Sequence, residues 1–168
     1  MNMYKNPRSA YIHIPFCHRR CFYCDFAVVP IGDNIDSLNG NKSDTVKDYL
    51  TYLKKEILSI KHKSPLSTIY IGGGTPSILD PTQIADLINI FRKYYGIDRG
   101  AEITMEVDPA SFDEYSLNGF INAGINRFSL GAQSFNDEIL KKSGRRHTKD
   151  DVFNSCSWLS KVKNENFI

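Results

Sequence analysis

Three cysteines near the start of the chain, Cys17, Cys21 and Cys24, have the spacing C-x3-C-x2-C within the stretch YIHIPFCHRRCFYCDF at residues 11–26. They lie too close together for all three to pair as disulfides. The two short gaps instead allow one loop to wrap around a single inorganic centre. Because thiolates favour zinc and iron–sulfur clusters, the spacing indicates a metal or iron–sulfur site.

A fourth cysteine is missing from this loop. Structural zinc usually has four protein ligands, and cubane clusters are usually held by four cysteines. In a [4Fe–4S] cluster, one iron would remain open to a ligand that is not protein. The alternative is a zinc site completed by His13, His18 or a remote residue, although the spacing is unlike that of zinc knuckles. We interpret His18 as solvated rather than ligating.

The composition is that of an ordinary globular protein. The 168 residues are 41% hydrophobic and 24% charged, with a net charge of +2, which suits one domain with a sizeable core. The N-terminus has no apolar signal-peptide region, and no apolar run approaches the roughly 18 residues of a spanning helix. We expect a cytoplasmic protein, where free thiolates persist, with no integral membrane segment and no bound nucleic acid.

Strand and helix patterns alternate along the chain. Strands are predicted at 9–14, 67–71, 102–107 and 127–130, and helices at 44–60, 81–94, 111–123, 136–142 and 150–160. Ser43 or Asp44 is a suitable helix cap, and Gly124 a suitable helix end. Residues 28–44 are rich in Asn and Gly and predict a flexible exposed connection.

The repeated order of strand, loop and helix predicts an α/β fold whose parallel sheet closes wholly or partly into a TIM-type (β/α) barrel. An apolar pair, Phe167 and Ile168, indicates the start of a fifth strand. We therefore expect a partial barrel that is truncated after about four βα units.

Polar and glycine-rich segments follow the predicted strands, where such folds assemble active sites. The triplet Gly72–Gly74 lacks the lysine of a P-loop, so close backbone approach to a ligand is favoured over phosphate binding, whereas a tight turn would need one glycine. Glu106 could bind ribose hydroxyls or an ammonium group, or be a cap or surface charge. Gln133 alone is a weak signal.

Two further segments have plain interpretations. Arg145, Arg146 and His147, taken alone, indicate a solvated loop. Cys156 lies beside Trp158 in a helical pattern, which favours packing in the core over a functional thiol.

Five segments together resemble the radical S-adenosylmethionine (SAM) superfamily, and within it the branch of oxygen-independent coproporphyrinogen III oxidase and the haem chaperone HemW. They extend from Tyr11 to Thr148 and read YIHIPFCHRRCFYCDF, IYIGGGTPS, ITMEVDP, FSLGAQSFND and GRRHT. The resemblance implies that residues 1–168 are the N-terminal part of a radical SAM core domain, with a cluster loop at 15–26. The rest of the barrel and a C-terminal domain would be absent.

The resemblance also implies cofactors and ligands. Cys17, Cys21 and Cys24 would bind three irons of a [4Fe–4S] cluster, and SAM would chelate the fourth iron through its amino and carboxylate groups. Electron transfer to the sulfonium would then give methionine and a 5′-deoxyadenosyl radical. The residues that would line the SAM site are Tyr11, Tyr23, Gly73, Gly74, Thr75, Glu106, Gln133 and Arg145.

One position separates the members of this branch. The oxidase has a cysteine two residues after the third cluster cysteine, where this chain has Phe26. Phe26 and the GRRHT segment resemble the HemW group, which implies binding haem and passing it to an acceptor protein, with an electron donor of flavodoxin or ferredoxin type. The alternatives are decarboxylation of coproporphyrinogen to protoporphyrinogen in haem biosynthesis, and an inactive remnant. His13, His18, His62 and His147 lie in no recognisable haem motif.

Overall fold

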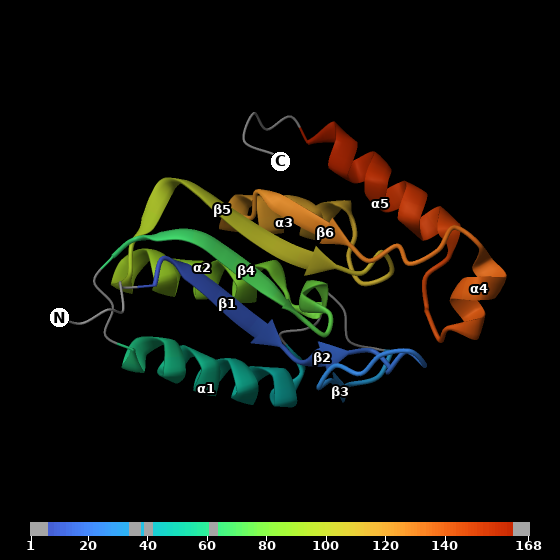
Figure 1. Ribbon diagram of the computed structural model, residues 1–168, viewed down its shortest axis with the longest axis horizontal. Coiled ribbons are helices and arrows are strands. Elements are labelled where there is room, and N and C mark those ends of the chain that lie inside the picture. Colours follow the sequence, from blue (N-terminus) through green and yellow to red (C-terminus); the bar gives the residue numbers. More distant parts are fainter. Residues whose placement is uncertain (1–6, 34–37, 39–41, 61–63, 163–168) are drawn as a thin grey trace.

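A computed structural model of the chain describes residues 7–33, 38, 42–60 and 64–162. Four strands form one parallel sheet in the order β1-β4-β5-β6, and their C-terminal ends meet at one edge (Figure 1). The strands are β1 (Ser9–Ile14), β4 (Leu66–Gly73), β5 (Ile97–Val107) and β6 (Arg127–Leu130). The predicted α/β fold with a parallel, partly formed barrel is confirmed.

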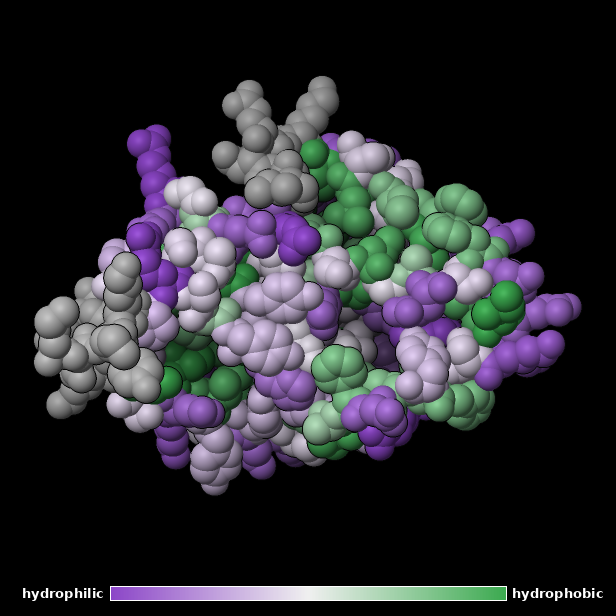
Figure 2. Space-filling view, in the orientation of Figure 1, coloured by the Kyte–Doolittle hydropathy of each residue, from purple (hydrophilic) through white to green (hydrophobic). Residues whose placement is uncertain are grey.

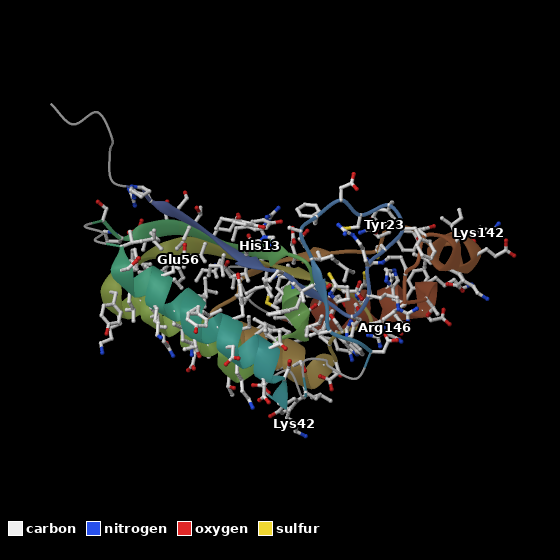
Figure 3. The ribbon with its side chains drawn as sticks, turned by 90° about the horizontal axis from the view of Figure 1, so that it is seen from below. His13, Tyr23, Lys42, Glu56, Lys142 and Arg146 are labelled. Atoms are coloured by element: carbon white, nitrogen blue, oxygen red, sulfur yellow. The ribbon has the colours of Figure 1, made fainter. Side chains whose placement is uncertain are left out.

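Helices cover one face of this sheet, as Figure 3 shows for α1 below the strands. The α-helices in the described residues are α1 (Asp44–Ser59), α2 (Pro81–Tyr94), α3 (Glu114–Ala123), α4 (Asp137–Lys142) and α5 (Lys149–Lys161). Helices α1, α2 and α3 supply the buried helix residues of the core, and α5 contacts α3. Alternate strand residues, such as Ile12, Ile71 and Met105, are buried against them. Because side chains alternate along a strand, the residues between these point to the opposite face.

The predicted helix ends agree closely with the structure. Ser43 caps α1 by accepting a hydrogen bond from the backbone N–H of Val46 at 3.4 Å. Asp80 forms a capping box at α2, whose first residue is Pro81. Gly124 ends α3 in the left-handed conformation, with φ 114°. These local signals explain why the boundaries could be predicted from the sequence.

Three elements differ from their predicted bounds by more than one residue. Strand β4 ends at Gly73, two residues after the predicted end, so Gly72 and Gly73 belong to the strand. Strand β5 begins at Ile97, five residues before the predicted start. Helix α3 begins at Glu114 rather than Ser111, because Ser111 closes a turn on the carbonyl of Asp108, at 3.0 Å, and Asp113 is the cap. The predicted strand start at Phe167 lies outside the described residues.

The prediction that Cys156 packs in the core is wrong. Helix α5 buries Val152 and Ser155, and Cys156, one position further round the helix, is exposed. Side chains of the hydrophobic kind gather on the visible face over α5 and near α4 (Figure 2). Among them, Phe153 lies beside Phe135, with ring centroids 5.8 Å apart.

A two-stranded parallel pairing closes the base of the cysteine segment. Strand β2 (Phe16–Cys17) pairs with β3 (Val29–Pro30), and Val29 donates to the carbonyl of Pro15 at 2.7 Å. The sequence did not predict this pairing, although Val29 and Pro30 are exposed as expected for the connection. No helix in the described part of the chain is long and apolar enough to cross a membrane.

Candidate functional site

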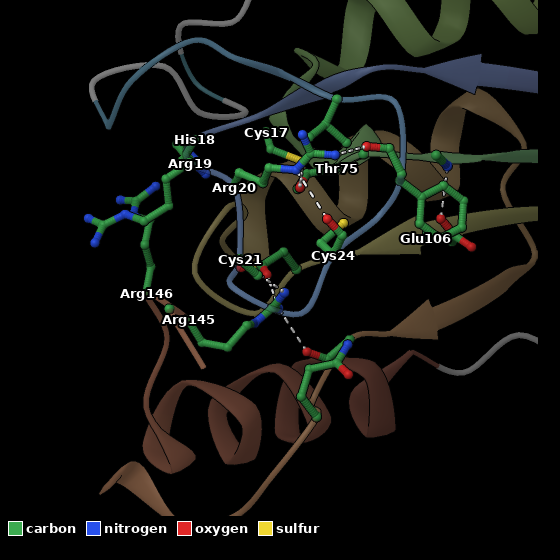
Figure 4. Close-up of a pocket in the computed structure, with 18 of the residues that line it drawn as sticks. Cys17, His18, Arg19, Arg20, Cys21, Cys24, Thr75, Glu106, Arg145 and Arg146 are labelled. Atoms are coloured by element: carbon green, nitrogen blue, oxygen red, sulfur yellow. Dashed lines mark hydrogen bonds and ion pairs between the residues drawn. The ribbon is translucent and has the colours of Figure 1, made fainter. Parts of the chain in front are cut away.

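A cavity of about 330 Å³ lies at the C-terminal edge of the sheet (Figure 4). It is lined by every residue predicted for the site except Tyr11, namely Cys17, Cys21, Tyr23, Cys24, Gly73, Gly74, Thr75, Glu106, Gln133 and Arg145. We call residues 15–26 the cysteine loop, and residues 73–75 with 106–108 the strand-end wall. The cavity lies between them.

The cysteine loop is fixed mainly through its backbone. Phe22 donates its N–H to the carbonyl of Ser143 at 3.0 Å, and Cys24 donates to Cys21 at 3.1 Å. The guanidinium of Arg20 donates to the carbonyls of Cys24, at 3.1 Å, and Phe26, at 2.7 Å. Several side chains nevertheless face solvent, and that of Phe22 is 81% exposed.

Cys17 is the thiol that contacts the strand-end wall. The hydroxyl of Thr75 donates to its Sγ at 3.4 Å. Burial raises the pKa of Cys17, and the Thr75 hydroxyl only partly opposes this. A metal that binds Cys17 must therefore displace its proton, and Thr75 is placed to stabilise the resulting thiolate.

Two glycines are required where chain segments approach closely, Gly73 beside β1 and Gly74 beside the cysteine loop. Gly73 has φ +116°, and a Cβ there would lie 2.6 Å from the ring of His13. A Cβ on Gly74 would lie 2.5 Å from the carbonyl oxygen of Phe16 and 3.0 Å from Sγ of Cys17. The glycines thus let two pieces of protein meet, a role that the sequence interpretation, which considered only a ligand or a turn, did not include.

Glu106 is held at the cavity by two donors. Tyr70 donates its hydroxyl to Oε1 at 2.7 Å, and Gly73 donates its N–H to Oε2 at 3.0 Å. The hydrogen bond to Glu106, together with burial, raises the pKa of Tyr70. The surface-charge and capping interpretations of Glu106 therefore do not describe its position.

Tyr11 lies beside the cavity rather than on its wall. Its ring stacks on that of Tyr70, with centroids 6.0 Å apart, and its hydroxyl lies 3.1 Å from Nδ1 of His13. Tyr11 and His13, two residues apart in β1, share the face of the sheet that the helices leave uncovered.

The prediction of a solvated loop at residues 145–147 is wrong. Arg145 forms an ion pair with Asp108 and also donates to the carbonyl of Gly131 at 3.0 Å. Its Nη1 lies 3.7 Å from Sγ of Cys21. The side chain of His147 is fully buried, 2.9 Å from the carbonyl of Ala132.

The charge of Asp108 is stabilised in this setting. Burial raises its pKa, but the contacts with His147 and with the guanidinium of Arg145 outweigh burial, so the pKa lies below its usual value. The same carboxylate raises the pKa of Arg145 against the opposing effect of burial. Both partners are therefore charged at neutral pH.

Two more side chains near the cavity have notable settings. His18 is buried, so its interpretation as a solvated side chain is wrong. Gln133 has φ 60°, the one positive value outside glycine among the described residues. Such a conformation is costly and is most often retained at functional sites, which fits the place of Gln133 on the cavity wall.

The donor set fits an iron–sulfur cluster. Each cysteine of such a cluster binds a different iron, so the sulfurs are spaced around the cluster rather than around one ion. Three soft thiols line one cavity. Within the part of the chain that the structure describes, no three His, Cys, Asp or Glu side chains are grouped so as to hold one metal ion.

Asp108 and Tyr70 were missed as site residues. A signal was available for Asp108, because it lies two residues after Glu106 and so continues the same face of β5. Tyr70 could also have been found, because it is the register partner of Tyr11 in the neighbouring strand and therefore lies on the same face of the sheet. The pairing of Asp108 with Arg145, 37 residues away, had no such signal.

The sequence pattern of the radical SAM superfamily matches residues 11–168. Since that match covers nearly the whole chain, the chain belongs to the radical SAM superfamily. Membership implies a [4Fe–4S] cluster and SAM as cofactors.

Individual relatives narrow the comparison. The chain is 42% identical over 165 residues to the heme chaperone HemW of Synechocystis sp. and 38% identical to that of Lactococcus lactis, covering 98% of this chain in both cases. It spans only 39% and 40% of those two proteins. An oxygen-independent coproporphyrinogen III oxidase of Salmonella typhimurium is 34% identical over 89% of this chain and 31% of its own length.

A solved structure has the same fold. It is coproporphyrinogen III oxidase (HemN) from Escherichia coli, described as a radical SAM enzyme, with a TM-score of 0.79 and 29% identity. The alignment covers 94% of this chain and 35% of that one. The partial barrel therefore corresponds to about a third of a known architecture.

Proposed function

We propose that this chain is part of a HemW-like radical SAM protein that binds a [4Fe–4S] cluster and SAM and handles haem. The observation that carries the proposal is convergence: three cysteines and seven further residues from separate segments line one cavity at the strand ends. Cys17, Cys21 and Cys24 would be the cluster ligands. When bound, the cluster and SAM would supply reductive one-electron chemistry.

The remaining residues would position SAM. The backbone of Gly73 and Gly74 and the side chain of Thr75 form the part of the wall nearest Cys17. Glu106 offers a carboxylate, and Arg145 a guanidinium, to polar groups of the ligand. Tyr23 and Gln133 would complete the wall, and Tyr11 would act from the neighbouring sheet face.

Haem handling is supported by sequence similarity to named heme chaperones and by the residue at position 26. The similar proteins that span nearly all of this chain include several named heme chaperones, and Phe26 occupies the position at which the oxidase has a cysteine. We propose haem as ligand, a haem-acceptor protein as partner, and a flavodoxin- or ferredoxin-type electron donor. These partners belong to a whole protein of which the chain spans about two fifths.

Coproporphyrinogen oxidation is the second candidate. It is favoured by the 34% identity to the Salmonella typhimurium oxidase and by the fold shared with the Escherichia coli enzyme. The oxidase would remove carboxylate groups from propionate side chains, whereas a chaperone would leave the porphyrin unchanged. The two candidates therefore predict different products from the same cofactors.

The test uses the full gene product after anaerobic reconstitution with iron and sulfide. We expect iron–sulfur absorption, a change in the cluster spectrum when SAM is added, and haem binding without turnover of coproporphyrinogen. Stoichiometric protoporphyrinogen formation would instead establish the oxidase. A colourless product that retains no iron would reject both candidates and support an inactive remnant.

A further inference from the structure

We propose that Asp108 is a positioning residue that holds the guanidinium of Arg145 between the strand-end wall and the cysteine loop, oriented toward the carboxylate of SAM. The inference rests on the proposed function, because that function supplies SAM as the ligand of Arg145 in the cavity. It adds a residue that would not contact that ligand itself. Three sets of contacts and the burial of the ion pair support it.

The backbone of Asp108 is held by hydrogen bonds that do not involve its side chain. Its N–H donates to the hydroxyl of Ser77 at 2.9 Å, and its carbonyl accepts from the hydroxyl of Ser111 at 2.8 Å. These two serines are buried, and their hydroxyls also hydrogen-bond to each other. The turn after β5 therefore has little freedom to relax when the side chain of Asp108 is changed.

The carboxylate of Asp108 is divided between two tasks. Oδ1 accepts the N–H of Ala110 at 3.1 Å, which fixes the plane of the carboxylate. Oδ2 accepts from Nη2 of Arg145 and lies 3.8 Å from Nδ1 of His147. Because Oδ1 is occupied by the chain itself, Oδ2 presents Arg145 with one defined direction.

The ion pair is shielded from water. The side chain of Arg145 is 12% exposed and that of Asp108 is 17% exposed. An exposed pair would contribute little, whereas loss of one partner in a shielded pair leaves the other without compensation. The position of Arg145 should therefore depend strongly on the charge of Asp108.

Arg145 joins the two sides of the cavity. Nη2 donates to the carbonyl of Gly131 at the end of β6, while Nη1 reaches Sγ of Cys21 on the cysteine loop (Figure 4). Its guanidinium also lines the cavity. Asp108 and Gly131 hold Nη2, and Nε lies 3.4 Å from Nδ1 of His147, so Nη1 is the nitrogen left to face the cavity, where an anionic ligand group would bind.

A purely structural role is the competing explanation. In that case Asp108 would only attach residues 143–148 to the sheet, and its loss would lower stability and cluster content. The positioning role predicts a different pattern, because the cluster ligands themselves come from another segment. Measurements of SAM affinity, cluster content and unfolding on the same variants separate the two explanations.

The experiment compares Asp108→Asn with the unmodified full gene product, reconstituted anaerobically. Asn keeps the size of the side chain and one acceptor oxygen, which can still accept the N–H of Ala110, but it removes the charge and replaces the second oxygen with an NH2 donor. We expect iron content to stay near that of the unmodified protein and the fold to be retained with a lower unfolding midpoint, while the Kd for SAM, measured from the change in the cluster spectrum, rises about tenfold. Asp113→Asn is the matched control, because Asp113 caps α3 and lies outside the cavity lining.

A coupling measurement completes the test. In an Arg145→Lys background, Asp108→Asn should change the Kd by less than about twofold, because the oriented guanidinium is already gone. An unchanged Kd in Asp108→Asn, an equal effect in both backgrounds, or a primary loss of iron or fold would each overturn the positioning role. If the unmodified protein binds a cluster but no SAM, the proposed function fails first, and this inference falls with it.

Discussion

The cysteine loop and the strand-end wall face each other across one cavity but are held by different means. The wall lies at the ends of β4 and β5, which pair with each other as the two central strands of the sheet. Its polar groups already have hydrogen-bond partners within the chain. The loop is irregular, depends on a few backbone hydrogen bonds and the arginine Arg20, and exposes Phe22 to solvent.

The difference concerns which half of the site is complete before a cofactor binds. Glu106 and Asp108 are held by donors that belong to the chain, so the wall is pre-organised. The thiols of the loop have fewer such contacts, and their proposed partners are irons. We therefore expect changes in the loop to affect cluster retention, and changes in the wall to affect folding stability and ligand affinity.

The largest effect is expected from removing a thiol of the loop. Replacing Cys17, Cys21 or Cys24 with Ser should abolish stable cluster binding, because a hydroxyl is a harder and much less acidic ligand than a thiol. Iron analysis and absorption after anaerobic reconstitution measure the result. Cys156→Ser is the control, since Cys156 is exposed on α5, and it should retain the cluster.

Gly74→Ala tests the contact between loop and wall. The added Cβ would meet the carbonyl oxygen of Phe16 and Sγ of Cys17, so the two segments must separate. We expect a loss of about 1–3 kcal/mol in unfolding free energy, as for overpacked interiors, together with lower iron content. Denaturant titration of the apo-protein and iron analysis provide the measurements.

Gly100→Ala is the matched control for that substitution. A Cβ on Gly100 would meet nothing within 4 Å. The control should leave iron content unchanged. Equal iron content in both variants would show that the close approach at Gly74 does not matter for the site.

Arg20→Met removes the side chain that holds two carbonyls of the cysteine loop. The stem remains, but the hydrogen bonds to Cys24 and Phe26 are lost, which in this exposed setting should cost about 1 kcal/mol. Faster cluster loss to an iron chelator is the expected outcome. Arg19→Met, which breaks only an exposed pair with Asp33, should leave that rate close to normal.

Tyr70→Phe should have the smallest effect, because it removes one hydrogen bond from the wall. Glu106 keeps the N–H of Gly73, so its position changes little. We expect an increase of about threefold to fivefold in the Kd for SAM, as for one net hydrogen bond, with iron content unchanged. Tyr115→Phe, on an exposed tyrosine, is the control. Loss of iron in Tyr70→Phe would contradict the separation of roles between wall and loop.

Local signals explain what the sequence could predict. Pro15 and Pro109 end strands, Gly124 ends a helix, and the spacing of the cysteines limits their geometry to one loop. The strand ends of a parallel sheet meet at one edge, so the predicted site residues could be placed together without knowledge of any contact.

Side-chain burial outside regular strands could not be predicted in the same way. His18 and His147 are polar residues in loops, where composition favours solvent, yet both are buried by segments distant in sequence. The pair of Asp108 and Arg145 and the pairing of β2 with β3 depend on the same long-range packing. Cys156 was misplaced because a helix with few apolar residues does not define its buried face clearly.

The pairing of β2 with β3 has a consequence for how a cluster could assemble. Hydrogen bonds from Val29 to Pro15 and from Ile31 to Cys17 join the two ends of the cysteine segment, so that the thiols lie on or within a closed ring of the chain. Once one thiolate binds iron, the ring keeps the other thiolates close to that iron. Their effective concentration is therefore higher than it would be on an open, flexible segment. Much of the entropy cost of gathering the ligands is then met during folding, before the first iron arrives.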